Sequence, residues 1–359
     1  MKKQWVPALA AVVASGCAGP TASLPPSPTT GSVMATSLHL VSEFSMPVAS
    51  LVHVSVGDRY VTWSTGQTIE AYDLESKRSV TVATAVPPEI LDYPQTSHGI
   101  VAYVSIAHLP QADQDLLPWS IRAVDVTTMQ SVQSIQGRAP MAGALLPQPA
   151  LDWPWLVWTQ QEDSAYPPSY DHPPIGDTRS LNLTTGEERT LIHDWFPARI
   201  SVTSGLVVAE VGQRRSNAPP TTDVYVVPAN GAAKPRPLTS SGHATLPAAS
   251  DGEVAWLLHG ETGYDAVLVK PLSDATAMGV KIADANEGGL AIGRGFVAWI
   301  GDDGSLWVRS TTTTSHPQMI ASATQFALAS GVSARGSTVA WGDQLDKQFT
   351  LHVASVKLD

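Results

Sequence analysis

Cysteine and charge are the two features that this sequence has least of. One cysteine in 359 residues excludes an intrachain disulfide as a source of stability. Only 15% of the residues are charged, and 21 basic against 32 acidic residues give a net charge of −11. Nucleic acids and anionic lipids attract clustered Lys and Arg, so this balance argues against a nucleic-acid binder and against electrostatic docking on a membrane.

Long hydrophobic runs and helix-period patterns are scarce as well. The apolar segment at residues 6–13 is far shorter than the roughly 20 residues of a membrane-spanning helix. Hydrophobic residues make up 43% of the chain, with abundant Val, Thr and Trp, and 27 Gly with 28 Pro supply turns. This composition favours an all-β fold.

Residues 1–16 have the features of an export signal, with Lys2 and Lys3 before the apolar segment. The following Ala14-Ser15-Gly16-Cys17 resembles the lipobox of bacterial lipoproteins, although Ala14 stands where Leu is commonest. The resemblance implies cleavage before Cys17, acylation of its sulfur, and anchoring outside the cytoplasmic membrane or in the outer membrane. The alternative is ordinary signal cleavage that leaves a free thiol. Residues 17–37 are rich in Pro, Ser and Thr and are predicted to be a tether.

One sequence pattern recurs seven times after residue 38: a turn with Gly or Asp, two or three β-forming residues, and a closing aromatic residue. Spacings of 40 to 55 residues between copies fit one four-stranded propeller blade, with strands A (inner) to D (outer). We therefore predict that residues 38–359 form a seven-bladed β-propeller with these residues on strand B, buried between blades. The copies end at Trp63, Tyr103, Trp158, Glu210, Trp256, Trp299 and Trp341.

The seventh copy reaches Asp359 directly after its third strand, so the last blade needs an outer strand from elsewhere. Residues 38–44 are predicted to supply it by pairing near residues 349–356, which leaves no open blade edge. The repeat resembles the TolB-like propeller repeat over nearly all of residues 38–359. That resemblance implies the fold and not the role of the translocation protein TolB, whose α/β domain has no counterpart in the predicted tether.

Catalytic signatures do not accompany the repeat. The sequence has no Gly-x-Ser-x-Gly elbow, glycine-rich phosphate loop or HExxH motif, and its ten His residues are dispersed. Gly301-Asp302-Asp303-Gly304 lacks the alternating acids of a calcium loop and is predicted to be a hairpin turn. We therefore predict no metal and no cofactor.

Two groups of residues are candidates for binding on the face where the D–A and B–C connections emerge. The enlarged B–C loops of blades 2 to 4 would form a ridge, unless they are neutral insertions. Its candidates are Asp113, Asp115, Trp119, Tyr166, Tyr170, Asp171, His172, Arg214 and Arg215. The D–A connections would place a second group around the channel mouth, unless these residues are polar because they face water. This group contains Glu89, Asp92, Arg199, His243 and Glu287.

These patterns predict a monomeric envelope lipoprotein whose propeller binds a protein or glycan partner and touches the membrane only through its lipid. One alternative is an enzyme of polysaccharide lyase or glycosidase type, with converging carboxylates or a His-bound metal at the channel mouth. A structural subunit with an exposed apolar patch is another. Glu210, an acid where six copies have Trp or Tyr, is expected to reach solvent through a shifted strand, or else to pair with Arg214 or Arg215.

Overall fold

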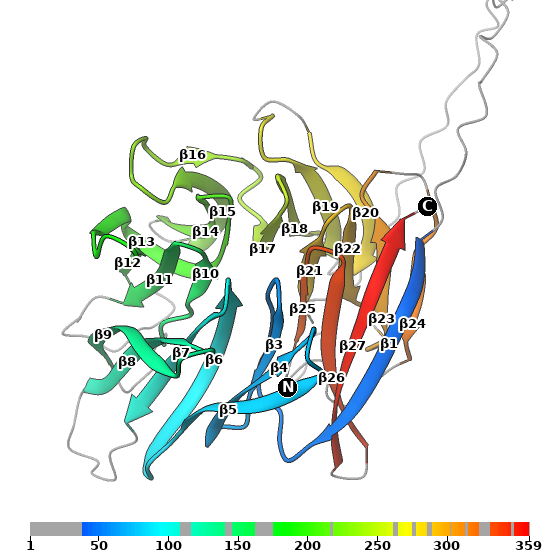
Figure 1. Cartoon of the computed structure of the whole chain (residues 1–359). Coiled ribbons are helices and arrows are strands. Elements are labelled where there is room, and N and C mark those ends of the chain that lie inside the picture. Colours follow the sequence, from blue (N-terminus) through cyan, green and yellow to red (C-terminus); the bar gives the residue numbers. More distant parts are fainter. Residues whose placement is uncertain are drawn as a thin grey trace, which may run out of the picture. The chain divides into compact units, whose positions relative to one another are not determined.

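The structure is a computed structural model. It describes residues 38–107, 116–140, 146–161, 175–215, 218–260, 265–274, 278–285, 289–301, 303–312, 315–322, 331–345 and 348–358. In this part of the chain the regular elements are β-strands, arranged as seven four-stranded antiparallel blades in a ring (Figure 1). The predicted fold is confirmed. No helix among these residues is long and apolar enough to cross a membrane.

The strands of blades 1, 2, 5 and 6 follow one another in sequence order from the channel outwards. Blade 1 contains β2 (Val54–Val56), β3 (Tyr60–Ser64), β4 (Thr68–Asp73) and β5 (Arg78–Thr84). Blade 2 contains β6 (Glu89–Ser97), β7 (Ile100–Ala107), β8 (Leu116–Asp125) and β9 (Gln130–Pro140). Blade 5 contains β17 (Ala244–Ser250), β18 (Glu253–His259), β19 (Asp265–Pro271) and β20 (Val280–Ala285). Blade 6 contains β21 (Leu290–Gly293), β22 (Phe296–Ile300), β23 (Leu306–Ser310) and β24 (Gln318–Ala321).

Blades 3 and 4 share one strand. The strand β13 (Glu188–Thr203) is the outer strand of blade 3 and continues as the inner strand of blade 4, which joins the two blades into a seven-stranded sheet. The other strands of blade 3 are β10 (Ala150–Asp152), β11 (Trp155–Gln161) and β12 (Gly176–Asn182). Those of blade 4 are β14 (Leu206–Arg215), β15 (Ala218–Pro228) and β16 (Arg236–Pro237).

Blade 7 closes the ring with strands from both ends of the described chain. It consists of β25 (Val332–Arg335), β26 (Thr338–Leu345), β27 (Gln348–Leu358) and, as its outer strand, β1 (Leu38–Val48). The pairing of β1 with β27 runs from Leu38↔Leu358 to Val48↔Phe349, with one irregularity between Leu40 and Ser42. This confirms the predicted closure and extends it four residues beyond the predicted segment.

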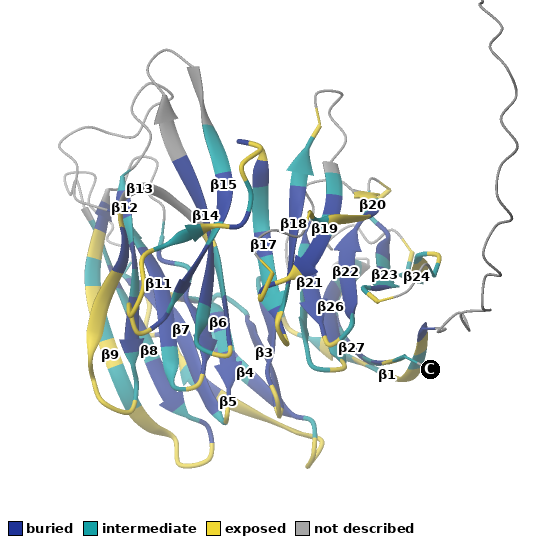
Figure 2. Cartoon of the chain, turned by 90° about the horizontal axis from the view of Figure 1, so that it is seen from above, coloured by how far each residue is buried: buried dark blue, intermediate teal, exposed yellow. Residues whose placement is uncertain are grey.

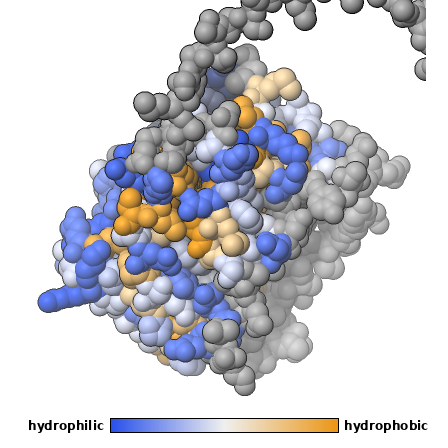
Figure 3. Space-filling model, turned by 90° about the vertical axis from the view of Figure 1, so that its right-hand side faces the viewer, coloured by the Kyte–Doolittle hydropathy of each residue, from blue (hydrophilic) through white to orange (hydrophobic). Residues whose placement is uncertain are grey.

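The core lies between neighbouring blades, where buried residues follow the strands and exposed residues gather at turns (Figure 2). The six aromatic residues of the repeat are at most 4% exposed, which confirms their predicted burial. Burying one such ring removes about 150–250 Å² from water, an upper-bound stabilisation of about 4–6 kcal/mol. Figure 3 shows one side of the molecule, where a group of apolar residues lies among polar ones. The exposed apolar residues of the outer strands include Val41 on β1 and Met319 on β24.

Glu210 contradicts the expectation that a shifted strand would expose it. It pairs in register with Val224 and is 8% exposed. Its carboxylate reaches blade 5 instead, where Oε2 accepts a hydrogen bond from the backbone N–H of Leu246 at 3.0 Å. Burial raises the pKa of Glu210, against the opposing effects of this bond and of the charges of Arg199 and His259. The alternative pairing involves side chains of Arg214 and Arg215 that lie outside the described set.

Candidate functional site

The predicted ridge is only partly visible in the structure. Asp113, Asp115, Tyr166, Tyr170, Asp171 and His172 lie outside the described residues. Arg214 and Arg215 belong to the backbone of β14, but their side chains are likewise not described. What the structure does show is that blades 2 and 4 have long strands, with 10 and 11 residues in β14 and β15 against five each in β22 and β23.

The prediction that Trp119 is an exposed anchor is wrong. It lies on β8, not in a loop, and is 4% exposed, in a core cluster with Leu151 and Trp158 of blade 3. Gly137 on β9 leaves room for the ring, since a Cβ at that position would overlap it. The alternation of Leu117, Trp119 and Ile121 is the sequence signal for this strand.

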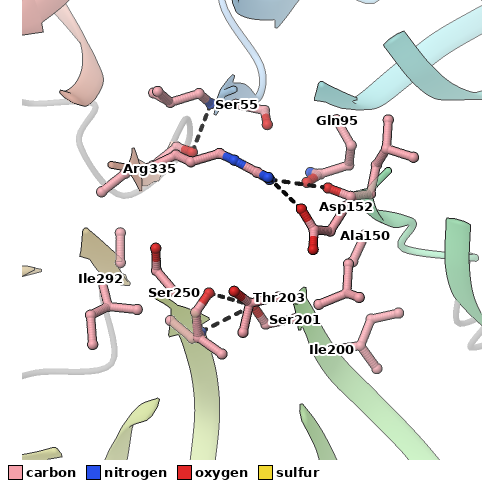
Figure 4. A pocket seen from close by; sticks show the side chains of 18 of the residues that line it. Ser55, Gln95, Ala150, Asp152, Ile200, Ser201, Thr203, Ser250, Ile292 and Arg335 are labelled. Atoms are coloured by element: carbon pink, nitrogen blue, oxygen red, sulfur yellow. Dashed lines mark hydrogen bonds and ion pairs between the residues drawn. The ribbon is translucent and has the colours of Figure 1, made fainter. Parts of the chain in front are cut away.

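A polar channel of about 500 Å³ runs between the inner strands of all seven blades. Because each strand A runs from the D–A connection to the A–B turn, the start of each inner strand lies at the mouth and its end at the opposite, A–B, end. Ser55, Gln95 and Ser201 line the channel between these ends (Figure 4).

Arg335 crosses the channel at its A–B end. Its Nε donates to Asp58 Oδ1 of blade 1 at 2.9 Å, and its Nη2 donates to Asp152 Oδ1 of blade 3 (Figure 4). Ser204 of blade 4 donates its N–H to Asp152 Oδ2 at 2.6 Å. We call Arg335, Asp58 and Asp152 the Arg335 cluster; it links blade 7 to two other blades.

The charges of the Arg335 cluster shift one another's proton affinities. Burial acts to raise the pKa of Asp58, but Arg335 and His98 together lower it below its usual value. Burial acts to lower the pKa of Arg335, but the bonds and charges of Asp152 and Asp58 raise it. Both partners are therefore held in their charged forms. The repeat does not predict this cluster; the sequence signal for it is an Arg at the end of strand A, where the other blades have Val, Ser, Asp, Thr or Gly.

At the mouth of the channel His53 lines the cavity and is bonded to Asp92. Asp92, a predicted mouth residue, is not itself part of the lining, and His53 was not among the predicted residues. Asp92 Oδ1 accepts hydrogen bonds from His53 Nδ1 at 2.7 Å, Ser64 Oγ at 2.6 Å and Tyr93 N at 2.8 Å. The Tyr93 ring lies 4.3 Å from the His53 ring, centroid to centroid. Burial, followed by the charge of Asp92, raises the pKa of Tyr93, which keeps its phenol protonated.

Arg199 and Gln148 face the same mouth. Both line the channel with His53 and Tyr93, and Gln148 is a hydrogen-bond partner of the Tyr93 phenol. Arg199 belongs to the half of β13 that forms the inner strand of blade 4. Among the described residues, no carboxylate forms an ion pair with Arg199, although its charge acts through space on Tyr93 and Glu210. The mouth therefore combines an imidazole, a phenol, an amide and a guanidinium.

The remaining predicted mouth residues are not part of this group. Glu89 lies in a separate groove on blade 2, because its side chain points along the blade face to Ser105 and Arg122, with 2.7 Å between Glu89 Oε1 and Arg122 Nη2. Its predicted place at the mouth is wrong. Burial acts to raise the pKa of Glu89, but the bonds from Ser105 and the backbone N–H of Val86, with the charge of Arg122, lower it. His243 is exposed and does not line the channel, and Glu287 lies outside the described residues.

A metal-binding arrangement is not found in the described part of the chain, where no three His, Cys, Asp or Glu side chains come together to hold an ion. His53 and Asp92 are bonded to each other, and none of the described residues supplies a third such ligand beside them.

Comparison with known proteins reveals similarity in structure but not in sequence. No protein-family profile and no curated protein sequence matches the chain. The oligogalacturonate lyase of Vibrio parahaemolyticus superposes with a TM-score of 0.56 at 10% identity, covering 89% of this chain and 98% of the lyase. The Pyrococcus horikoshii acylaminoacyl peptidase gives 0.55 at 10% identity, covering 80% of this chain and 50% of the peptidase.

TolB from Acinetobacter baumannii is also similar, with a TM-score of 0.47 at 13% identity, covering 83% of this chain and 63% of TolB. The chain thus spans about half of the peptidase and almost all of the lyase. At such low identities the lyase and the peptidase show the fold alone. The class of protein that fold and comparisons define is a seven-bladed β-propeller.

Proposed function

We propose that this propeller is a binding module that takes its ligand on the face of the D–A and B–C connections, with the channel mouth as the floor of the site. The observation that carries the proposal is the asymmetry of the channel. At the A–B end, the charged groups of the Arg335 cluster form ion pairs with one another. At the mouth, His53, Tyr93 and Arg199 line the open end of the channel, whose whole volume of about 500 Å³ lies in the range of ligand sites.

The long strands of blades 2 and 4 support this choice of face. They extend the blades on either side of blade 3, whose B–C segment of residues 162–174 holds the predicted anchors Tyr166 and Tyr170. Rigid strands that carry aromatic and charged side chains at their tips are common in binding surfaces. The mixture of acids and arginines suits a protein or glycan partner, and the net charge of −11 disfavours nucleic acid.

The cellular setting that we propose is the bacterial envelope, with a monomeric propeller held by a lipid on Cys17 through the tether of residues 17–37. The support comes from the lipobox-like Ala14-Ser15-Gly16-Cys17 and from the absence of any second cysteine that could pair with Cys17.

A second candidate function is catalysis at the mouth, favoured by the His53–Asp92 pair. A carboxylate that accepts from Nδ1 leaves Nε2 of the imidazole able to take a proton. A glycosidase would need two carboxylates facing each other across the site, and among the described residues none lines the channel at its mouth, because Asp92 is bonded to His53 outside the lining. Of the two enzyme types considered, the lyase type therefore fits better.

The test compares three variants of the mature full-length protein against ligands found by screening envelope proteins and glycans. Replacing residues 162–174 by a tight hairpin and Arg199→Gln should each weaken binding about tenfold or more, with little change in melting temperature. Arg294→Gln is the control, because its side chain is 75% exposed and lines the channel at the A–B end. Binding that survives the first two changes but is lost in the control would place the ligand on the opposite face.

A further inference from the structure

We infer that the channel mouth binds the carboxylate group of an acidic oligosaccharide. In this site Arg199 holds the carboxylate and His53 accepts a hydrogen bond from a neighbouring sugar hydroxyl. The inference rests on the proposed function, because it names the ligand class for the same face. It goes beyond that proposal by assigning the two contacts that select the ligand.

The distribution of charge along the channel points to an anionic ligand. Among the described residues, three Asp and three Arg line the channel. At the A–B end, Arg335 pairs with Asp58 and Asp152, and Arg294 lies 3.6 Å from Asp251. That leaves Arg199 at the mouth, without an ion pair among the described residues. A guanidinium that faces a cavity and has no bonded counter-ion is suited to bind a carboxylate through two parallel N–H donors.

Asp92 does not oppose an anionic ligand, because its own bonds already engage it. Its Oδ1 accepts from His53, Ser64 and Tyr93, and the side chain is only 14% exposed. It is also absent from the channel lining, so a ligand at the mouth meets His53 before it meets the carboxylate.

His53 is held in one tautomer by this arrangement. An ionised carboxylate can only accept hydrogen bonds, so the proton of a neutral His53 must be on Nδ1. Nε2, on the far side of the ring from Asp92, is then a hydrogen-bond acceptor. Sugar hydroxyls are donors of the kind that such an acceptor needs.

The surroundings of these two residues favour a sugar over a peptide. The His53 and Tyr93 rings lie side by side at the mouth, tilted by 33° to each other, and both carry polar edges; Gln148 is a hydrogen-bond partner of the phenol. Deeper in the channel lie the polar side chains of Ser55 and Gln95, which are suited to hydroxyl groups (Figure 4). Anchoring a peptide would require an apolar pocket for a large side chain at the centre of the site, and these residues do not form one.

The experiment is isothermal titration calorimetry of the mature full-length protein with uronic acid oligosaccharides of two to four units. The same oligosaccharides with methyl-esterified carboxylates serve as the neutral pair. We expect the ester to bind about 10- to 100-fold more weakly than the acid, the effect of one charge-assisted contact. Arg199→Gln should abolish this preference, Arg199→Lys should restore part of it, and Arg294→Gln should leave it unchanged.

Asp92→Asn tests the positioning role of Asp92 separately. Loss of the fixed tautomer should weaken the acid and the ester by the same factor and leave their ratio unchanged. Affinity equal to that of the unsubstituted protein would contradict the role of His53. The melting temperature of each variant shows whether it is folded.

Three results would overturn the inference: no uronide binding, equal affinity for acid and ester, or a preference that persists in Arg199→Gln. A tripeptide with a free carboxyl terminus and its amide are the second pair of probes. Stronger binding of that tripeptide than of the uronide would overturn the glycan assignment. If the inference fails while a screened ligand still depends on residues 162–174, the proposed function stands without it.

Discussion

The guanidinium of Arg335 bonds to two other blades, and Arg335→Met tests how much this contact stabilises the ring. The substitution keeps most of the side-chain volume but leaves two carboxylates without their counter-ion. Asp58 is 45% exposed, so losing its ion pair should cost no more than about 1 kcal/mol. Asp152 is 11% exposed, and a buried charge deprived of its partner costs about 3–5 kcal/mol.

Asp152 retains one compensating contact, the N–H of Ser204 at 2.6 Å, which reduces the cost. We therefore expect Arg335→Met to lower the free energy of unfolding by about 2–4 kcal/mol and the melting temperature by roughly 5–10 °C. In Arg335→Met/Asp152→Asn the unpaired buried charge is gone, so the double variant should be more stable than Arg335→Met. Arg294→Gln is the surface control and should cost less than about 1 kcal/mol.

The pH dependence gives an independent check by differential scanning calorimetry. The folded pKa of Asp58 is depressed, so its contribution to stability is present above the unfolded value near 3.8 and is lost as pH falls through the folded value. The difference in melting temperature between the unsubstituted protein and Arg335→Met should therefore shrink below about pH 4. A variant that melts within 1 °C of the unsubstituted protein at about pH 7, or a double variant no more stable than Arg335→Met, would refute this reasoning.

Two further predictions concern Glu210 and Cys17. Glu210→Gln keeps an oxygen that can accept the hydrogen bond from Leu246 N–H. The pKa of Glu210 is raised in the folded state, so the contribution of this residue to stability falls as pH rises. The free energy of unfolding of the variant should therefore exceed that of the unsubstituted protein by on the order of 1 kcal/mol at pH 8 and should equal it near pH 4. Thermal melts at the two pH values check this, and a loss of stability at pH 8 would contradict it. Cys17→Ala should release an intact propeller from the membrane fraction, whereas an unmodified thiol in the intact mass of the membrane-bound protein would disprove acylation.

The sequence predicted the fold because each of the seven blades packs against its neighbour in the same way, so the same pattern of residues recurs seven times. Each blade buries one large side chain on strand B against its neighbour, and six of these positions, such as Trp158 and Trp341, carry an aromatic residue at blade spacing. The closure by β1 followed from counting strands, since the seventh repeat is one strand short. What the period did not reveal is that β13 continues without a break from blade 3 into blade 4.

The site was less predictable because it depends on contacts between distant blades. Arg335 and Asp58 are 277 positions apart, and no local pattern indicates that their side chains meet in the channel. His53 was missed for a similar reason, since its partner Asp92 is on the next blade. The repeat predicts a loop position for Trp119, because strands B and C of blade 2 are longer than those of blades 1, 3, 5 and 6 and a spacing of 55 residues cannot distinguish longer strands from a longer connection.

Glu210, the one closing residue of the repeat that is not aromatic, bonds to a bulged inner strand at the channel rim. The inner strand β6 has an irregularity between Asp92 and Gln95, and β17 has one between Thr245 and Ala248. Each contains a residue with positive φ that precedes a proline: Tyr93 at 50° and Leu246 at 51°. Such a conformation is costly for a residue with a large side chain and must be held by its neighbours.

In both bulges a carboxylate bonds the N–H of the strained residue. Asp92 accepts from Tyr93, and Glu210, from strand B of blade 4, accepts from Leu246 of blade 5. A Trp or Tyr at position 210 would bury more apolar surface but would leave the Leu246 N–H without this carboxylate acceptor. In blade 2 the bulge brings the Tyr93 ring against His53 at the mouth, the surface on which the proposed ligand rests. The bulge in β17 at the channel rim therefore explains both the positive φ of Leu246 and the acid at position 210, where the other six copies of the repeat have Trp or Tyr.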